Sequence, residues 1–385
     1  MRALVYACAL GAVLGVSAPA LAGPFEEALA IIDDAKQLAT HRDEAIAKLK
    51  QAVAADPKLA HAWYNLGLLQ KMAGDRAAAQ ASWRSTLTAD PNYAPARARL
   101  AQLDLEAGKT VEATRALEAI VEQNRYQPEA RNLLAGIAME AGDYEGAIRH
   151  ARNVLLGDPD NMNAYLNLAV AYFRQGLVDQ AWLIVTNALD RKPDAAALHN
   201  MLGLIYLKKD DARHATESFL RALQENPSLV DAKLNLGALE LAYGDFESAL
   251  KRFNEVLEVQ PKDYMVQISR AVALRGLKRY DEAEKGYEAA LALKPEAPEA
   301  MYNLCVLHHQ YTQKWQQALR SCTEYSRQID RKHPKYTEIK KRLASIEAIL
   351  KAREAQQPAP EPTPAPTPAP SGGGGGDSTS GGGAP

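Results

Sequence analysis

Residues 60–93 read AHAWYNLGLLQKMAGDRAAAQASWRSTLTADPNY and contain two helix-forming runs separated by a short break. Gly74-Asp75 interrupts the first run and Pro91 ends the second, because glycine and proline disfavour continuation of a helix. Each run places mostly apolar or small residues three or four positions apart, as one face of an α-helix requires. These residues are Trp63, Leu66, Gly67 and Gln70 in the first run and Ala79, Trp83 and Thr86 in the second. The stretch therefore predicts two helices joined by a tight turn.

The same pattern recurs along the chain with a period of 34 residues. Its register is marked by Pro57, Pro91, Pro159, Pro193, Pro227, Pro261 and Pro295. Only the slot at Arg125 lacks a proline, and alanine stands twelve residues before every slot. Nine units fit this register, starting near residues 26, 60, 94, 128, 162, 196, 230, 264 and 298. Such a period indicates a repeat array in which neighbouring units stack, since no single unit can bury its apolar faces alone.

The repeat resembles the tetratricopeptide repeat (TPR). The motifs that carry the resemblance are Trp63-x-x-Leu66-Gly67…Ala79…Trp83…Pro91 and, more closely, Leu202-Gly203-x-x-Tyr206…Ala215…Phe219…Pro227. The resemblance implies an all-α fold, a right-handed α-solenoid of stacked helix-turn-helix units over residues 23–332. The edges depart from the pattern. Asp33 stands where glycine or alanine is usual, and the last unit needs one extra residue near Gln313 to place Ala318.

Residues 1–22 have the pattern of a secretory signal peptide. Arg2 precedes an uncharged apolar run, and Ala20-Leu21-Ala22 is a small-x-small sequence that signal peptidase accepts. Cleavage after Ala22 predicts a periplasmic or secreted protein. Lipid attachment at Cys8 is disfavoured because the apolar run follows this cysteine instead of preceding it. No later apolar run is long enough to span a bilayer, so we expect no integral membrane span after cleavage.

Two segments follow the array. Residues 333–355 predict a capping helix that begins near Pro334, because a solenoid needs a terminal element with one polar face. Its apolar face is formed by Ile339, Leu343, Ile346 and Leu350. Residues 356–385 alternate proline with other residues and then become rich in glycine and serine, so we expect a disordered tail. The tail is either a spacer for a partner or an unconstrained terminus.

Composition and motifs disfavour several functions. The chain has 45 Lys and Arg residues against 47 Asp and Glu residues, which disfavours nucleic-acid binding through a strongly basic surface. The sequence has no phosphate-binding glycine loop, zinc-protease motif or serine-hydrolase motif. We therefore expect a protein that is not an enzyme and uses no cofactor.

One group of reactive side chains lies in the last unit. Cys305 and His308 are one helical turn apart, and Cys322 lies on the second helix of the same unit. We expect no metal site, because a suitably placed fourth ligand is missing. Both cysteines occupy inward repeat positions. They predict either a disulfide, worth about 3 kcal/mol, or two buried thiols.

In the TPR family the first helix of each unit lines the concave side of the stack, and specific positions on it contact ligands. Mapping these positions here predicts a protein-binding groove. Its residues are Tyr64, Asn65, Leu68, Leu166, Asn167, Val170, Phe173, Leu204, Leu207, Leu234, Asn235, Leu241, Met265, Ile268, Val272, Tyr302, Asn303 and Val306. A long exposed apolar strip marks a protein-binding surface, and the alternative is that part of it packs against adjacent helices or the cap.

The four asparagines in this set all occupy the sixth repeat position. Similar superhelical TPR arrays use an asparagine ladder to grip an extended peptide backbone, and the alternative is that these amides satisfy helix backbone groups. The Lys/Asn/Lys/Arg set with which chaperone-adaptor TPR domains grip a C-terminal carboxylate does not occur at the matching positions. Recognition of chaperone tails is therefore disfavoured.

These features predict a non-enzymatic periplasmic scaffold or adaptor whose groove binds peptide or helix segments of other envelope proteins. The chain resembles TPR components of trans-envelope assemblies, such as those of gliding motility, type IV pili and polysaccharide export. The alternative is a non-catalytic accessory subunit for glycan- or peptidoglycan-handling enzymes. That function would need aromatic side chains such as Tyr64, Phe173 and Tyr302 to stack on sugar. Self-association is left open.

Overall fold

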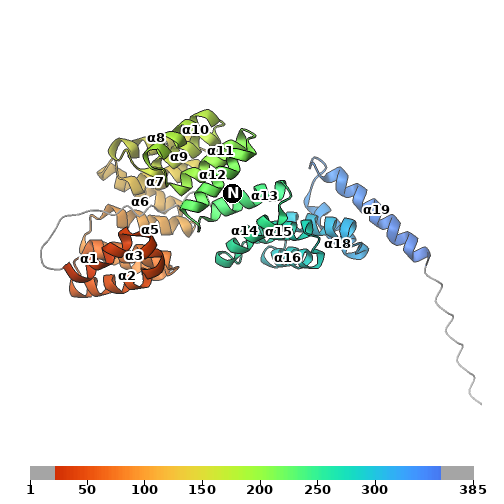
Figure 1. Cartoon of the computed structure of the whole chain (residues 1–385), viewed down its shortest axis with the longest axis horizontal. Helices are drawn as coiled ribbons and strands as arrows, with labels where there is room; N and C mark the ends of the chain where they lie inside the picture. Colours follow the sequence, from red (N-terminus) through yellow and green to blue (C-terminus); the bar gives the residue numbers. More distant parts are fainter. Residues whose placement is uncertain (1–21, 357–385) are drawn as a thin grey trace, which may run out of the picture. The chain divides into compact units, whose positions relative to one another are not determined.

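A computed structural model of the chain describes residues 22–356, and every regular element in that range is a helix (Figure 1). The all-α fold class is therefore confirmed. The predicted signal peptide, except for Ala22, and the tail beyond Gln356 lie outside the described residues. The chain divides into two compact units, the first ending at Pro295 and the second beginning at Glu296. None of the helices in the described range is long and apolar enough to cross a bilayer.

The first unit consists of consecutive helical pairs. They are α1 (Ala22–Asp33) with α2 (Ala35–Ala55), α3 (Ala60–Met72) with α4 (Arg76–Ala89), α5 (Ala94–Glu106) with α6 (Thr110–Gln123), α7 (Pro128–Glu140) with α8 (Tyr144–Gly157), α9 (Met162–Arg174) with α10 (Val178–Arg191), α11 (Ala196–Lys208) with α12 (Ala212–Glu225), α13 (Val230–Ala242) with α14 (Phe246–Val259), and α15 (Tyr264–Gly276) with α16 (Tyr280–Leu293). From α3 onward, the first helix of each pair begins 34 residues after the previous one. From α2 to α14, each second helix also packs on the first helix of the following pair.

The turn inside a pair depends on one residue in the left-handed region of backbone space. Gly142 takes this conformation between α7 and α8 with a φ of 78°, and Asp210 takes it between α11 and α12 with a φ of 61°. Asp143 then caps α8, since its side chain accepts the backbone N–H of Gly146. An aspartate cap of this kind satisfies one of the free N–H groups at a helix start. A cap of this kind also begins α4, α12 and α14, whereas α6, α10 and α16 begin without a side-chain cap.

In two of the pairs, close approach of the helices needs a residue without a side chain. A Cβ atom added to Gly203 on α11 would lie 2.5 Å from the ring of Phe219 on α12. The equivalent Gly67 on α3 faces Trp83 on α4, where the added atom would lie 2.4 Å from the indole. Phe219 and Trp83 are both fully buried. In these two pairs, the core therefore contains a large aromatic side chain that packs against a glycine of the partner helix.

The first pair is irregular. Its helices are separated by a single residue, and α2 contains a non-helical residue, His41, with φ −119° and ψ 21°. This is the pair in which Asp33 replaces the usual glycine or alanine. Residues 40 and 41 stand one repeat before Gly74-Asp75, so the kink at His41 falls where the regular repeat has its turn.

The second unit contains α17 (Pro298–Val306), the π-helix η1 (Leu307–Tyr311), α18 (Trp315–Gln328) and α19 (Tyr336–Ala355). The extra residue expected near Gln313 is taken up in η1, where the N–H of Thr312 donates to the carbonyl of Leu307 at 3.0 Å. A π-helical turn contains one residue more than an α-helical turn, so it accommodates an insertion without breaking the helix. The cap helix α19 packs on α18 and buries Ile339 and Ile346 completely.

Candidate functional site

The predicted groove residues all lie on the first helices of their pairs, but their exposure differs widely. Tyr64, Asn167, Val170, Ile268 and Val306 are buried. Leu207 and Met265 are 36% and 43% exposed. The half-buried members are Asn65, Leu68, Leu166, Phe173, Leu204, Leu234, Asn235, Leu241, Val272, Tyr302 and Asn303. The set is therefore not one uniform surface.

Apolar side chains recur on four neighbouring first helices. α9 contacts α11, α11 contacts α13, and α13 contacts α15. Phe173, Leu207 and Leu241 occupy the same repeat position near the ends of the first three of these helices. We define the first-helix strip by its half-buried or exposed members, which are Leu166, Phe173, Leu204, Leu207, Leu234, Leu241, Met265 and Val272.

The sixth-position asparagines link neighbouring first helices. Asn167 Nδ2 donates to Asn132 Oδ1 at 3.1 Å, and Asn235 Nδ2 donates to Asn200 Oδ1 at 2.9 Å. In both cases the acceptor occupies the fifth position of the preceding first helix. Asn303 Nδ2 donates to a carbonyl one turn earlier in its own helix, at 2.8 Å. For these three residues the structure favours the alternative in which the amides satisfy groups within the protein.

Tyr64 belongs to the packing between pairs and not to an open surface. Its side chain is 4% exposed, and its ring centroid lies 5.2 Å from that of Tyr93. Arg99 Nε donates to the Tyr64 hydroxyl at 3.4 Å. Arg99 is at the sixth repeat position and Tyr64 is at the fifth position of the preceding first helix, as in the asparagine pairs. Burial also raises the pKa of the Tyr93 hydroxyl. An aromatic platform for sugar at Tyr64 is therefore not available on this surface.

Tyr302 in the second unit is engaged by the cap helix. Its hydroxyl donates to Glu338 Oε1 at 3.0 Å, and Lys335 Nζ lies 3.3 Å from its ring centroid. Arg342 on the same helix donates to Glu338 and lies 3.1 Å from His309 Nδ1. Tyr302 therefore packs against the cap helix, which is the alternative that the sequence left open for part of the predicted groove.

Cys305 and Cys322 are joined by a disulfide between α17 and α18. Their Cα atoms are 4.8 Å apart, and both side chains are fully buried. The bond links the two helices of the pair that contains the π-helix. Among residues 22–356 no group of three or more His, Cys, Asp or Glu side chains is arranged to hold a metal ion.

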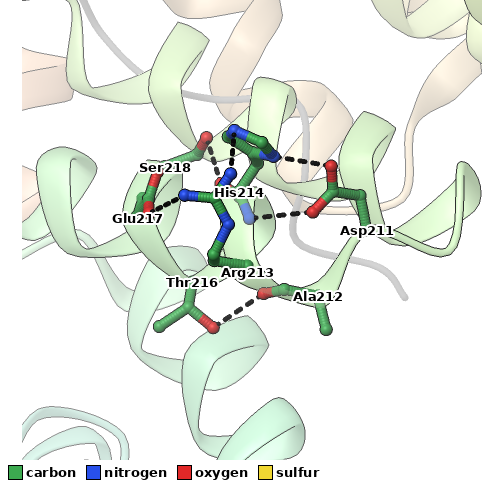
Figure 2. Close-up of polar contacts among 7 residues, drawn as sticks. All are labelled: Asp211, Ala212, Arg213, His214, Thr216, Glu217 and Ser218. Carbon is green, nitrogen blue, oxygen red and sulfur yellow. Dashed lines mark hydrogen bonds and ion pairs between the residues drawn. The ribbon is translucent and has the colours of Figure 1, made fainter.

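Sequence reasoning missed a polar cluster at the start of α12 (Figure 2). Asp211 accepts the backbone N–H of His214 at 3.1 Å and the His214 Nδ1–H at 2.6 Å. These two hydrogen bonds lower the pKa of the Asp211 carboxyl. Arg213 donates to His214 Nε2 at 2.9 Å and to Glu217 at 3.2 Å. Ser218 donates to the His214 carbonyl and not to the ring, so the cluster stabilises the helix start and does not activate a hydroxyl.

Stacked helical pairs with a period of 34 residues define a helical-repeat protein. Family models described as tetratricopeptide repeat match residues 71–137, 138–205, 196–229 and 234–298. Together these matches cover more than half of the chain. The chain belongs to the tetratricopeptide repeat family.

Solved structures of other proteins resemble this fold. TTC0263, a thermophilic TPR protein in Thermus thermophilus, is 24% identical; the match covers 47% of this chain and 98% of that chain, with a TM-score of 0.43. YrrB, a TPR protein with an unusual peptide-binding site, is 19% identical over 49% of this chain and 98% of that chain, with a TM-score of 0.37. A human IFIT1 dimer with PPP-AAAA is 16% identical over 89% of this chain and 88% of that chain, with a TM-score of 0.57. Comparison with curated protein sequences found no match.

Proposed function

We propose that this chain is a non-enzymatic scaffold that binds segments of other proteins along the first-helix strip. The observation that carries the proposal is the strip itself, in which apolar side chains recur on four contacting helices and include the exposed Leu207 and Met265. Contiguous exposed apolar surface marks a site of protein interaction. Repeat arrays bind partners along such extended surfaces.

The chemistry of the strip indicates the kind of segment that fits it. Asn167 and Asn235 donate hydrogen bonds to neighbouring helices, which leaves the apolar members of the strip as its contact groups. Phe173, Leu207 and Leu241 repeat once per pair, and a partner that places apolar residues at a matching interval would contact them in turn. An amphipathic helix or an extended peptide with regularly spaced apolar residues meets this requirement.

We further propose that the scaffold acts in the periplasm as a component of a trans-envelope assembly. The signal-peptide pattern of residues 1–22 supports export. The Cys305–Cys322 disulfide is consistent with an oxidising compartment, where such bonds form and persist. Cell fractionation with N-terminal sequencing tests the location: the expected product is periplasmic and begins at Gly23. An uncleaved cytoplasmic product would contradict it.

Photocrosslinking in cells tests the binding surface. A photoreactive residue in place of Leu207 should capture defined envelope proteins, and Leu241→Asp with Met265→Asp should abolish capture. Ile268 is unsuitable for this change because it is 5% exposed, and an aspartate there would be desolvated within the core. Leu220→Asp is the matched control, since Leu220 is 47% exposed on the second helix α12. Equal loss of capture in the control, or none in the strip variant, would contradict the proposal.

A further inference from the structure

A groove with a volume of about 480 Å³ lies between the second helices α2 and α4, above the first helix α3. Its lining is mostly apolar and includes Trp63, Gln70, Ala78, Ala81, Ser82 and Ser85. We call it the α2–α4 groove. Because second helices form its walls, it is separate from the first-helix strip.

On the side of α4, the groove is bounded by short side chains at positions where the pair α13–α14 carries long ones. In the pair α13–α14 these positions are bridged by long side chains. Lys233 Nζ lies 2.8 Å from Glu255 Oε2, and Arg252 Nε lies 3.5 Å from Glu240 Oε1. All four side chains of these bridges are at most 28% exposed. At the same repeat positions, the pair α3–α4 has Trp63 in place of Lys233, Ser85 in place of Glu255, Ser82 in place of Arg252 and Gln70 in place of Glu240.

Polar groups at the floor of the groove already have partners within the protein. Ser82 Oγ donates to Gln70 Oε1 at 2.7 Å, and Trp63 Nε1 donates to the carbonyl of Pro57 at 3.0 Å. A ligand entering the groove therefore meets mainly methyl groups and the indole ring.

The lining of the groove carries positive charge and no negative charge. Lys50 is the only charged residue in its lining, it is exposed, and it forms no ion pair with any other described residue. A carboxylate on the ligand would complement it, whereas a cation would be repelled.

We propose that the α2–α4 groove binds a short amphipathic α-helix of a partner protein, with an apolar face inserted and an acidic residue beside Lys50. Ala78, Ala81, Ser82 and Ser85 recur at i, i+3, i+4 and i+7, so one face of α4 lets another helix approach closely. The row from Ala78 to Ser85 spans about two helical turns, or about 10 Å. Helices seated in apolar grooves use the same spacing for their anchoring residues.

The probe for this site is a fluorescein-labelled, hydrocarbon-stapled helix of about 14 residues. It carries leucine at i, i+3, i+4 and i+7 and glutamate on its flanks, and its twin carries lysine in place of every glutamate. Binding to the full chain is measured by fluorescence anisotropy. The glutamate peptide should bind more tightly than the lysine peptide, by up to about fivefold for one exposed ion pair. Lys50→Glu should reverse this order.

Ala81→Arg fills the groove and should abolish binding of the glutamate peptide. The fold tolerates arginine at this repeat position, since Arg115 on α6 and Arg149 on α8 occupy it. Ala77→Arg is the matched control, because this substitution adds the same charge to the same helix. Ala77 is exposed and lies outside the groove. Absence of binding to the unmodified chain would overturn the proposal. Binding that survives Ala81→Arg, or an order of peptides that Lys50→Glu leaves unchanged, would also overturn it.

Discussion

Substitution of Gly203 by alanine tests whether helix contact or helix propensity controls the stability of a repeat. Gly203 lies inside α11, where alanine would be favoured over glycine by about 1 kcal/mol on propensity alone. The added Cβ, however, would lie 2.5, 2.6 and 2.8 Å from three ring atoms of Phe219. These distances are shorter than carbon–carbon contact, so either the ring or the helix must move.

The contact should outweigh the propensity. Phe219 is fully buried, so its ring cannot turn outward into solvent without losing its packing, and the cost should fall at the upper end of the roughly 1–3 kcal/mol typical of overpacked cores. After subtraction of the propensity gain, we expect a net loss of about 2 kcal/mol. Gly237→Ala is the matched control, because its Cβ would lie 3.0 Å from the ring of Phe253. There the loss should be smaller.

Urea denaturation followed by far-UV circular dichroism measures the effect, and amide hydrogen exchange of α11 and α12 locates it. Local measurement matters because a repeat array can open in parts. Shortening Phe219 to leucine in the Gly203→Ala background should recover part of the loss, a coupling that a double-mutant cycle detects. A Gly203→Ala chain as stable as the wild type, or more stable, would refute the packing argument and leave propensity as the controlling factor.

Three further changes test other contacts. The pKa of His150 is lowered below 6.5, mainly by burial and to a smaller extent by the positive charge of Arg131. The stability contributed by the neutral ring is therefore present above pH 6.5 and is lost as the pH falls. The His150→Gln variant should lose less stability than the wild type on acidification, measured as the shift of its urea midpoint. Asn235→Leu should cost about 1 kcal/mol by leaving Asn200 without its donor, and an unchanged midpoint would show that this bond contributes nothing. Reduction of the Cys305–Cys322 bond should weaken protection of α17 and α18 from hydrogen exchange by about 3 kcal/mol. Reductant should have no such effect on Cys322→Ser.

Helix positions in the regular repeats follow from local sequence because each turn has a local cause. Gly142 supplies the left-handed residue and Asp143 supplies the cap, and both are visible as single letters. Where Asp210 replaces the glycine, the proline register still places the helices, since the period is shared along the chain. The π-helix at Leu307–Tyr311 has no such marker. One extra residue can be accommodated at many points of a helix, and packing of the surrounding helices decides which.

The candidate surface was less predictable because exposure depends on the next helix. Leu234 and Ile268 occupy the same repeat position, yet Leu234 is half-buried and Ile268 is 5% exposed. The sixth-position asparagines raise the same difficulty. Asn167 bonds to Asn132 because their two helices bring these amides together, and a pattern read one unit at a time does not show a pairing between units.

In a repeat protein, the side chains at equivalent positions of other pairs show which residues the packing can accommodate. The α2–α4 groove is an example. Alanine and serine on α4 look ordinary in isolation, since both are compatible with a helix. Alignment of the pairs in register shows that Arg252 and Glu255 fit at the positions of Ser82 and Ser85. Packing of the repeat therefore does not require short side chains there. A partner helix seated beside Lys50 accounts both for the open space and for a cation without a counter-ion among the described residues around it.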